Sequence, residues 1–452
     1  MKILEKIKSK NNLPLILFII LFINYIPLIK ANIVTKESFG VGTKEMAICF
    51  AIELSILFLF LIRKIKITKL TVTNFVLLIL TTIALAIVQV NAYKLGNYEK
   101  LDVINIVCIF CNILFLFVLM LNLDIEEKYI YNFFKCMVFM GLFACVVNVY
   151  IYHEEILKLF EKGAKVYKIK SFFGHRNQFA IFLYTAIISN MFLILRKNKN
   201  IFYKLTLLIF LTNLLFTSSR TGLLCTAIFA VLFFITTDRF SIKTKIVIFI
   251  LGIDILLGAT YYINNSHPEI IENVKKVLIR SDSIKSFTGR SDLWEIGIDL
   301  ISENNSTKFF GIGRFKGVGI VEETKNLTQF HSFYIEALVA GGIMELVYFI
   351  LIYLTVIIKV MTSNLEKKYK SIYISMFISY FIYCLFESLS RFSIGCADTL
   401  CMIVFITIPI LHAYSIKKEE EKIYRVSKKW LSDGSDVIIE DKQNQEIINE
   451  EK

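Results

Sequence analysis

Residues 264–331 read NNSHPEIIENVKKVLIRSDSIKSFTGRSDLWEIGIDLISENNSTKFFGIGRFKGVGIVEETKNLTQFH and form the longest segment between two membrane-length apolar runs. Two pieces of the segment, Pro268–Arg280 and Ser291–Glu303, have the apolar spacing of an amphipathic helix. A glycine-spaced turn follows at Gly311–Gly319, and the segment ends on His331, directly before the next apolar run. The pattern predicts a structured loop that holds a histidine at a membrane surface.

Apolar runs flank this loop along the whole chain. The sequence is 56% hydrophobic and 20% charged, whereas soluble domains contain roughly 25% charged residues. Each run is near the ~17–25 residues that a helix needs to cross a bilayer. The runs are Leu13–Ile29, Met46–Ile62, Val72–Val90, Val103–Asn122, Asn132–Tyr152, Phe179–Leu195, Ile201–Thr217, Thr221–Thr237, Ile246–Ile263, Ser332–Ile358, Ser371–Phe386 and Ala397–Ser415. Because they are continuous rather than alternating, we expect an all-α polytopic membrane protein with about 12 transmembrane helices.

The basic residues of the short loops predict the orientation. They gather in the N-terminal ten residues, at Arg63–Lys69, at Arg196–Lys199 and at Lys367–Lys370, and such residues favour the cytoplasmic side. Both termini are then cytoplasmic. The predicted organisation is transmembrane helices 1–9 in residues 1–263, a large extracytoplasmic loop with amphipathic helices in 264–331, helices 10–12 in 332–415 and a cytoplasmic tail in 416–452.

Charge and cysteines exclude two other readings. The net charge of +13 is divided between two aqueous compartments, so we expect membrane lipid and not nucleic acid as the partner of the basic residues. The nine cysteines fall almost entirely within the apolar runs. We interpret them, Cys108 and Cys111 included, as small buried hydrophobic residues rather than a metal or redox site.

The arginines are distributed against the usual bias toward the cytoplasm. In the predicted topology the cytoplasmic arginines are Arg63, Arg196, Arg239 and Arg425, and the outer ones are Arg176, Arg220, Arg280, Arg290, Arg314 and Arg391. A guanidinium group forms forked contacts with phosphate oxygens that a lysine cannot form. The outer arginines therefore predict binding of a lipid-linked phosphate, with anchoring to phospholipid headgroups as the alternative.

Several of these arginines lie in polar motifs at predicted helix starts. His175, Arg176 and Asn177 precede the sixth apolar run, and Arg220 lies in a short turn before Gly222; helix starts favour anions. Helix capping by Asn177 and interfacial anchoring by the arginines are the structural alternatives. For Arg290 the alternative is a solvated loop charge. Arg314 lies among glycines that would let the backbone approach a ligand.

Carboxylates lie near the outer ends of two later runs. Glu336 follows His331 closely, and the eleventh run is followed by Glu387 and Arg391. Gly341 and Gly342 interrupt the tenth run and predict a kink there. An imidazole has a pKa suited to general-base work, which makes His331 the first candidate base and Glu336 or Glu387 the next.

At these residues the sequence resembles the O-antigen ligase and O-antigen polymerase (Wzy-type) superfamily. The motifs that carry the resemblance are Gly174-His-Arg-Asn177, Ser218-Ser-Arg-Thr-Gly222, Gly289-Arg-Ser-Asp-Leu-Trp294, Gly311-Ile-Gly313 and His331-Ser-Phe-Tyr334 with Glu336 and Gly341-Gly342. They follow the family's order between about residues 172 and 349, although Ser332 replaces the family's usual asparagine.

The resemblance implies a GT-C-like, inverting-type glycosyltransferase that moves an oligosaccharide from undecaprenyl pyrophosphate to an acceptor sugar at the outer face of the cytoplasmic (inner) membrane. It implies catalytic roles for His331, Arg220 and Arg290, with substrate binding by Arg176 and its neighbours. The full set of expected substrate-binding residues is Arg176, His175, Asn177, Arg314, Glu336 and Arg391. No Asp-x-Asp motif occurs in the outer loops, so we expect no metal and no other cofactor; a chain-length regulator protein is a possible partner.

The alternatives remain open at this stage. A polymerase for capsule, exopolysaccharide or O-antigen is favoured over a ligase, because the Lys-, Ile- and Asn-rich composition suggests an AT-rich genome that lacks a lipid A core acceptor. A peptidoglycan polymerase of the shape-and-division type is a third enzyme class. A polysaccharide flippase would also have about twelve spans, but we would expect repeat symmetry in its sequence.

Overall fold

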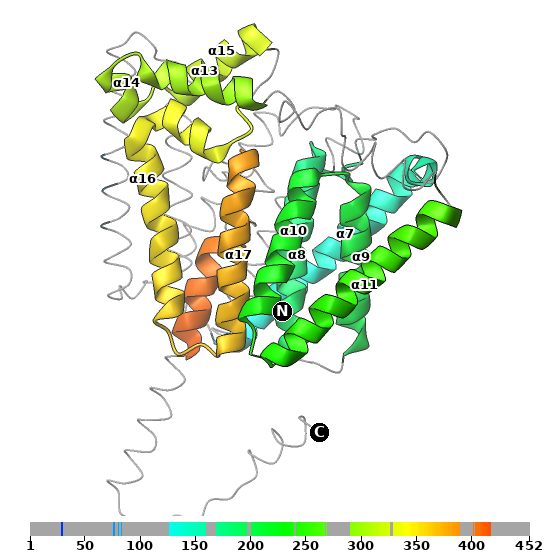
Figure 1. Ribbon diagram of the computed structural model, residues 1–452. Helices are drawn as coiled ribbons and strands as arrows, with labels where there is room; N and C mark the ends of the chain where they lie inside the picture. The colour runs from blue at the N-terminus through cyan, green and yellow to red at the C-terminus, as the bar shows by residue number, and fades with distance from the viewer. Residues whose placement is uncertain are drawn as a thin grey trace, which may run out of the picture.

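The computed structural model describes residues 126–159, 169–196, 200–238, 241–266, 290–325, 329–388, 401 and 403–416, with the isolated positions Ile29, Val76, Leu80, Ile83 and Pro268. Its helices are α7 (Glu127–Lys158), α8 (Arg176–Arg196), α9 (Ile201–Phe216), α10 (Arg220–Thr236), α11 (Ile242–Ser266), α13 (Arg290–Ser302), α14 (Asn305–Phe310), α15 (Arg314–Lys325), α16 (Phe333–Met361), α17 (Lys367–Phe386) and the π-helical η7 (Ile403–Thr407) (Figure 1). These ranges contain no strand.

The helices coincide with the apolar runs of the sequence. Four of them, α7, α8, α16 and α17, are long and apolar enough to cross a membrane, and α9, α10 and the segment Ile403–Ile416 are shorter apolar helices. The helix α11 covers the ninth predicted span and continues to Ser266. The first four predicted spans and the tail lie outside the described residues. The all-helical membrane class is therefore confirmed, whereas the total of about twelve spans stays a prediction.

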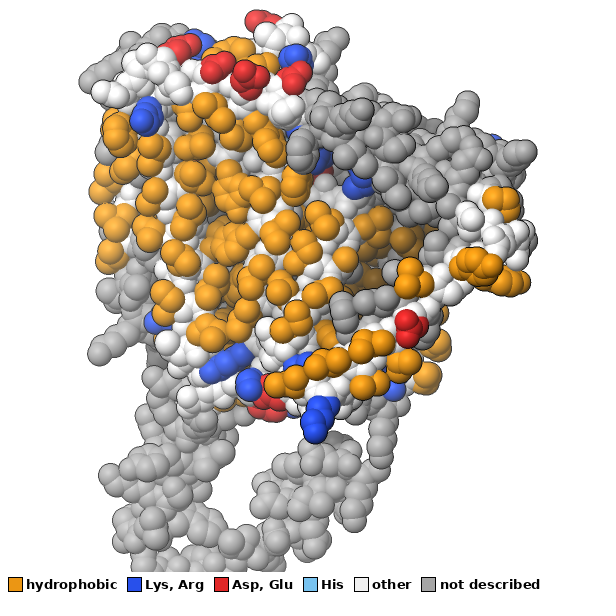
Figure 2. Space-filling model, viewed as in Figure 1, with side chains coloured by type: hydrophobic (Ala, Val, Ile, Leu, Met, Phe, Trp, Pro, Cys, Tyr) orange, Lys and Arg blue, Asp and Glu red, His pale blue; other side chains and the backbone are white. Residues whose placement is uncertain are grey.

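The outer face of the bundle is apolar. Large side chains such as Leu208 of α9, Val231 of α10 and Leu354 of α16 are more than 40% exposed, and Figure 2 shows that apolar side chains cover the middle of this face while charged ones gather mainly toward its two ends. In water such a surface would drive aggregation. The arrangement fits a multi-pass protein whose helices face lipid.

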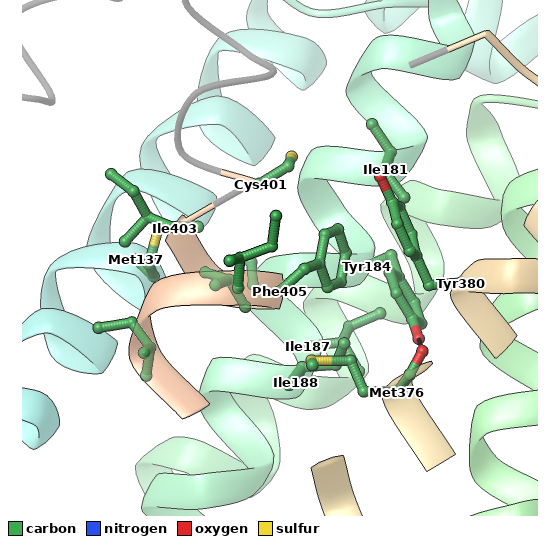
Figure 3. Packing of buried hydrophobic residues seen from close by; sticks show 14 of the residues in the cluster. Met137, Ile181, Tyr184, Ile187, Ile188, Met376, Tyr380, Cys401, Ile403 and Phe405 are labelled. Carbon is green, nitrogen blue, oxygen red and sulfur yellow. Dashed lines mark hydrogen bonds between the residues drawn. The ribbon is translucent and has the colours of Figure 1, made fainter. Parts of the chain in front are cut away.

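The core is one cluster of buried side chains from α7, α8, α10, α16, α17 and the segment that contains η7. The rings of Tyr380 on α17 and Phe405 on η7 are stacked with centroids 4.0 Å apart, and Tyr184 of α8 lies against Phe405 (Figure 3). The hydroxyl of Tyr184 is satisfied by a hydrogen bond with Ser379. Because α8, α10 and α17 also contact one another directly, the end of each helix is fixed relative to the others.

In the loop between α11 and α16 the described residues form a cap made of α13, α14 and α15, which lies across the upper end of α16 (Figure 1). Its small core consists of Leu293, Ile301, Ile312, Val321, Phe330 and Val339. The helix α13 confirms the amphipathic piece predicted at Ser291–Glu303 and begins one residue earlier, at Arg290. The other predicted piece, Pro268–Arg280, lies outside the described residues except for Pro268.

Glycines on both sides of the junction, Gly311 and Gly313 in the cap and Gly342 in α16, let the two backbones pack closely together. The predicted kink is confirmed, because Gly342 has φ 65° inside α16. A Cβ on Gly342 would lie 2.3 Å from the carbonyl carbon of Phe309, and one on Gly311, also at positive φ, would lie 2.5 Å from that of Ala340. The amide of Ile312 donates to the Val339 carbonyl at 2.8 Å. Only glycine permits this approach of backbone to backbone.

The predicted turn at Gly311–Gly319 is wrong beyond Gly313. The helix α15 begins at Arg314 and includes Gly317 and Gly319. Gly311 and Gly313 approach the backbone of α16 closely. Glycine spacing alone did not separate a ligand-binding turn from a packing junction, because both need the missing Cβ.

Candidate functional site

The polar motifs converge on Glu387, the residue that follows the last turn of α17. Glu387 is 3% exposed. Its Oε1 accepts hydrogen bonds from Asn177 Nδ2 at 2.6 Å, Arg290 Nη2 at 2.9 Å and Thr221 Oγ1 at 3.3 Å. The Nδ1 of His331 lies 3.9 Å from Oε2, a charge contact rather than a hydrogen bond. Four segments that are far apart in the sequence thus meet at one buried carboxylate.

The start of α8 is arranged so that Asn177 faces this carboxylate. His175 Nδ1 accepts the backbone N–H of Asn177 at 3.2 Å, so His175 and not Asn177 satisfies the free amide at the helix start. The Asn177 side chain is then available to donate to Glu387 and to accept from Ser219 Oγ at 2.8 Å. The alternative interpretation, in which Asn177 only caps the helix, is therefore wrong.

The start of α10 is held against α8 at the same place. Ser219 caps α10, because its Oγ accepts the N–H of Gly222 at 3.3 Å. A Cβ on Gly222 would lie 2.7 Å from the Cβ of Ala180 on α8, so the glycine allows the two helices to approach. The short turn before α10 therefore fixes Arg220, the first residue of that helix, beside Asn177.

Three arginines occupy equivalent positions, because Arg176, Arg220 and Arg290 are the first residues of α8, α10 and α13. The charge of Arg176 interacts with those of Glu387, Arg220 and Arg290, which places the three guanidinium groups within electrostatic reach of one another. The Nε of Arg176 is buried and has no hydrogen-bond partner among the described residues. Three helix starts and three guanidinium groups together make a strongly anion-attracting site.

The backbone is strained at or near three of the site segments, those of Arg176, Arg220 and His331. Among the described residues the non-glycine residues with positive φ are Ser171, Ser218 and His331, with φ of 52°, 50° and 53°. Ser171 lies five positions before Arg176, and Ser218 lies two before Arg220. The surrounding structure holds these conformations, since Ser171 Oγ donates to the Ala144 carbonyl at 2.7 Å. Strain of this kind concentrates at functional sites.

His331 is positioned by contacts on both sides of it. The amide of Phe330 donates to Glu336 Oε1 at 3.2 Å, and the amide of Phe333 donates to the Glu387 carbonyl at 3.1 Å. Its side chain is 19% exposed, and its Nδ1 is buried without a hydrogen-bond partner in the described part of the chain. With Nδ1 directed at Glu387, Nε2 is the nitrogen left for a ligand.

The electrostatic balance keeps Glu387 ionised. Burial alone would raise the pKa of this carboxyl, but the contacts of His331, Arg290 and Asn177 outweigh burial and hold the pKa below its ordinary value. Loss of the proton gives the carboxylate that pairs with Arg290. The site therefore contains an internal anion at neutral pH.

The structure places the remaining predicted residues as follows. His175 is exposed at the start of α8. Glu336 is buried and accepts a hydrogen bond from the Phe330 amide. Arg314 begins α15 in the cap, and no described hydrogen bond or ion pair joins it to Glu387. Arg391 lies outside the described residues. No cluster of three or more His, Cys, Asp or Glu that could hold a metal occurs within the described ranges.

The sequence named Glu387 only as a candidate base to follow His331 and did not assign it to substrate binding. The available signal was a carboxylate directly after an apolar run, with Arg391 close behind it. That signal fits an ordinary helix end equally well, because a charged residue at a membrane surface needs no special partner. Only the packing of α17 against α8 and α10 shows that the carboxylate points inward.

Comparison with known proteins agrees with this arrangement. Residues 205–350 match the family model described as O-antigen ligase. The matched range includes Arg220, Arg290 and His331, whereas Arg176 and Glu387 lie outside it. No curated protein matches the chain. The match confirms the resemblance seen in the motifs: residues 205–350 of this chain are similar to an O-antigen ligase domain, consistent with the O-antigen ligase and polymerase superfamily.

Proposed function

We propose that the protein is a polysaccharide polymerase of the outer face of the cytoplasmic membrane. It transfers an oligosaccharide repeat unit from undecaprenyl pyrophosphate to the sugar hydroxyl of an acceptor, in the synthesis of capsule, exopolysaccharide or O-antigen. The observation that carries the proposal is the convergence of Arg176, Arg220, Arg290 and His331 around Glu387 at one end of an apolar helix bundle. A site built this way fits an anionic lipid-linked substrate.

The arginines bind the pyrophosphate in this mechanism. Guanidinium groups form paired hydrogen bonds with phosphate oxygens, and the positive ends of the dipoles of α8, α10 and α13 add to the attraction. The unpartnered Nε of Arg176 is a donor that a phosphate oxygen would satisfy. As the glycosidic bond breaks, the same groups stabilise the charge that develops on the leaving pyrophosphate, which is the task that a metal ion performs elsewhere.

His331 accepts the proton of the acceptor hydroxyl. The acceptor oxygen attacks the anomeric carbon of the donor, the bond from that carbon to the pyrophosphate oxygen breaks, and its electron pair leaves with the pyrophosphate. The hydroxyl proton moves to Nε2 of His331, and the carboxylate of Glu387 3.9 Å from Nδ1 stabilises the imidazolium ion. A single displacement of this kind inverts the anomeric configuration.

The polymerase assignment remains the favoured form of the proposal, with the ligase as its close relative in chemistry. Both use the same donor and the same proton transfer and differ only in the acceptor. A chain-length regulator remains a proposed partner, and the proposed topology places both termini in the cytoplasm. The metal independence of transfer rests on the arginines and is tested below.

The decisive experiment replaces Arg220 with Lys. The point charge of lysine keeps the attraction but loses the fork, and a hydrogen bond to a charged group is worth about 1.5–3 kcal/mol, so transfer by purified R220K should fall about 10- to 100-fold. The matched control is R196K at the opposite end of α8, where Arg196 stacks on the Tyr131 ring 3.7 Å away; a lysine there keeps the cation–π contact.

Both variants and the wild type are assayed with lipid-linked repeat units, with and without excess chelator. We expect chelator to leave the wild-type rate unchanged. Polymer of wild-type length and rate from R220K would remove the arginine from pyrophosphate binding. Loss of wild-type activity in chelator, with recovery on adding magnesium, would show that a metal supplies the charge instead.

A further inference from the structure

The site contains an anion of its own, which would compete with the pyrophosphate. The carboxylate of Glu387 is 4% exposed and lies 2.9 Å from Nη2 of Arg290, whose side chain is 18% exposed. A buried carboxylate this close to the guanidinium occupies donors that a phosphate would otherwise use. The same Oε1 also accepts from Asn177 and Thr221, so the carboxylate joins the starts of three helices, α8, α10 and α13.

We propose that Glu387 is the internal counter-ion of the arginine cluster: it holds the cluster assembled while the donor is absent, and the donor's pyrophosphate competes with it for Arg290. This role rests on the proposed function, because it assumes that pyrophosphate is the ligand of the arginines. Glu387 is accordingly a positioning residue and a determinant of the charge that the site accepts, and it does not itself touch the reacting atoms.

A counter-ion is needed because the arginines repel one another. The like charges of Arg176, Arg220 and Arg290 act on each other across the site. Like charges held close together in a partly buried site repel one another, so the cluster is less stable without an opposing charge. Glu387 offsets this repulsion from a position fixed by the end of α17, which leaves the site preorganised for binding.

The charges also match the donor. Three guanidinium groups and one carboxylate leave two net positive charges when the imidazole of His331 is neutral. A pyrophosphate esterified at both ends, as in a lipid-linked saccharide, carries one negative charge on each phosphate at neutral pH. After transfer the free end of the lipid pyrophosphate gains a second ionisation. The carboxylate then repels a product that is more negative than the substrate, which favours product release.

The test compares the binding of inorganic pyrophosphate by wild type, E387Q and E387D, measured by titration calorimetry on purified protein together with the transfer rate. Glutamine has the shape of glutamate and keeps an oxygen that accepts from Asn177 and Thr221, but it lacks the charge. We expect E387Q to bind pyrophosphate at least about tenfold more tightly than wild type while transferring more slowly. E387D keeps the charge and should bind within about threefold of wild type.

Tighter binding distinguishes the counter-ion role from a merely structural one, since damage to the site would weaken binding. The matched control is E366Q at the other end of α17, where Glu366 is exposed and pairs with Lys368; it should bind as wild type does. If E387Q proves unstable without ligand, the same role predicts that pyrophosphate raises its melting temperature by more than that of wild type.

Two results would overturn the counter-ion role, and only the second would also overturn the proposed function. Equal or weaker pyrophosphate binding by E387Q, with binding by wild type intact, would refute the counter-ion role and leave the proposed function standing. Absence of pyrophosphate binding by wild type, together with normal transfer by R220K, would refute the proposed function and the counter-ion role with it.

Discussion

Replacement of His331 by glutamine tests the chemical step most directly. Glutamine keeps the approximate size and the hydrogen-bonding ability of histidine but cannot accept a proton near neutral pH. Because Arg290 is held by Glu387 and not by His331, the pyrophosphate site should survive the change. H331Q should therefore fold, bind the lipid-linked donor and release almost no product.

The magnitude follows from the position of the imidazole. A positioned general base accelerates transfer about 10²- to 10⁴-fold, which corresponds to about 3–5 kcal/mol of the activation barrier. The backbone at His331 has φ 53°, a conformation that costs roughly 1–2 kcal/mol for L residues. Most of this cost is the same for glutamine as for histidine. We therefore expect a large loss of rate with a change in stability below about 1 kcal/mol.

Two further variants separate the proton from the backbone. Asparagine tolerates positive φ better than most residues, so H331N relieves any strain that glutamine adds while still lacking a base. The matched control is H153Q, because His153 is exposed on α7 and its contact within the described residues is a hydrogen bond with the Tyr150 carbonyl at 3.3 Å. H331N should be as inactive as H331Q, and H153Q should transfer at the wild-type rate.

The assay uses purified proteins with lipid-linked repeat units and separates products by the number of repeats. Donor binding is measured in parallel, so that loss of chemistry is not confused with loss of the site. Polymer from H331Q within about threefold of the wild-type rate would remove His331 as the base. Glu336 or Glu387 would then be the next candidates to accept the proton.

Two other predictions concern the junction and the carboxylate. G342A should destabilise the junction of α14 and α16 and reduce transfer, because the new Cβ would meet the Phe309 backbone at 2.3 Å at a positive φ. The control G319A has nothing within 4 Å of its new Cβ and should be neutral or stabilise α15 by up to about 1 kcal/mol. Equal melting temperatures for the two variants would contradict this prediction. The pKa of Glu387 is lowered in the folded state, so its stabilising contribution is complete above the ordinary carboxyl pKa of about 4.3 and is lost as pH falls through the lowered value. The difference in melting temperature between wild type and E387Q should accordingly be constant from about pH 6 to 8 and shrink below about pH 4, and a difference that is unchanged at pH 3 would contradict the assignment.

The sequence by itself determined the class of the protein and the segments that carry its chemistry. Continuous apolar runs can satisfy their backbone in lipid only as helices, so the boundaries of α9 and α10 were predicted to within about a residue. The kink at Gly342 and the amphipathic helix α13 followed from local pattern as well. Arginine in place of lysine at the helix starts indicated phosphate chemistry, because the forked guanidinium geometry is a property of the residue itself.

Tertiary structure decided which of these residues form a site. The use of Gly311 and Gly313 in packing depends on their approach to Ala340 in α16. The inward direction of Glu387 depends on Asn177 and Thr221, which lie 210 and 166 positions earlier in the chain. Local sequence contains no record of such contacts, since a carboxylate after an apolar run is equally compatible with water and with a buried arginine. Because α17 packs against α8 and α10, Glu387 is shielded from water. A carboxylate buried in this way needs a partner of opposite charge, and Arg290 and His331 lie beside it.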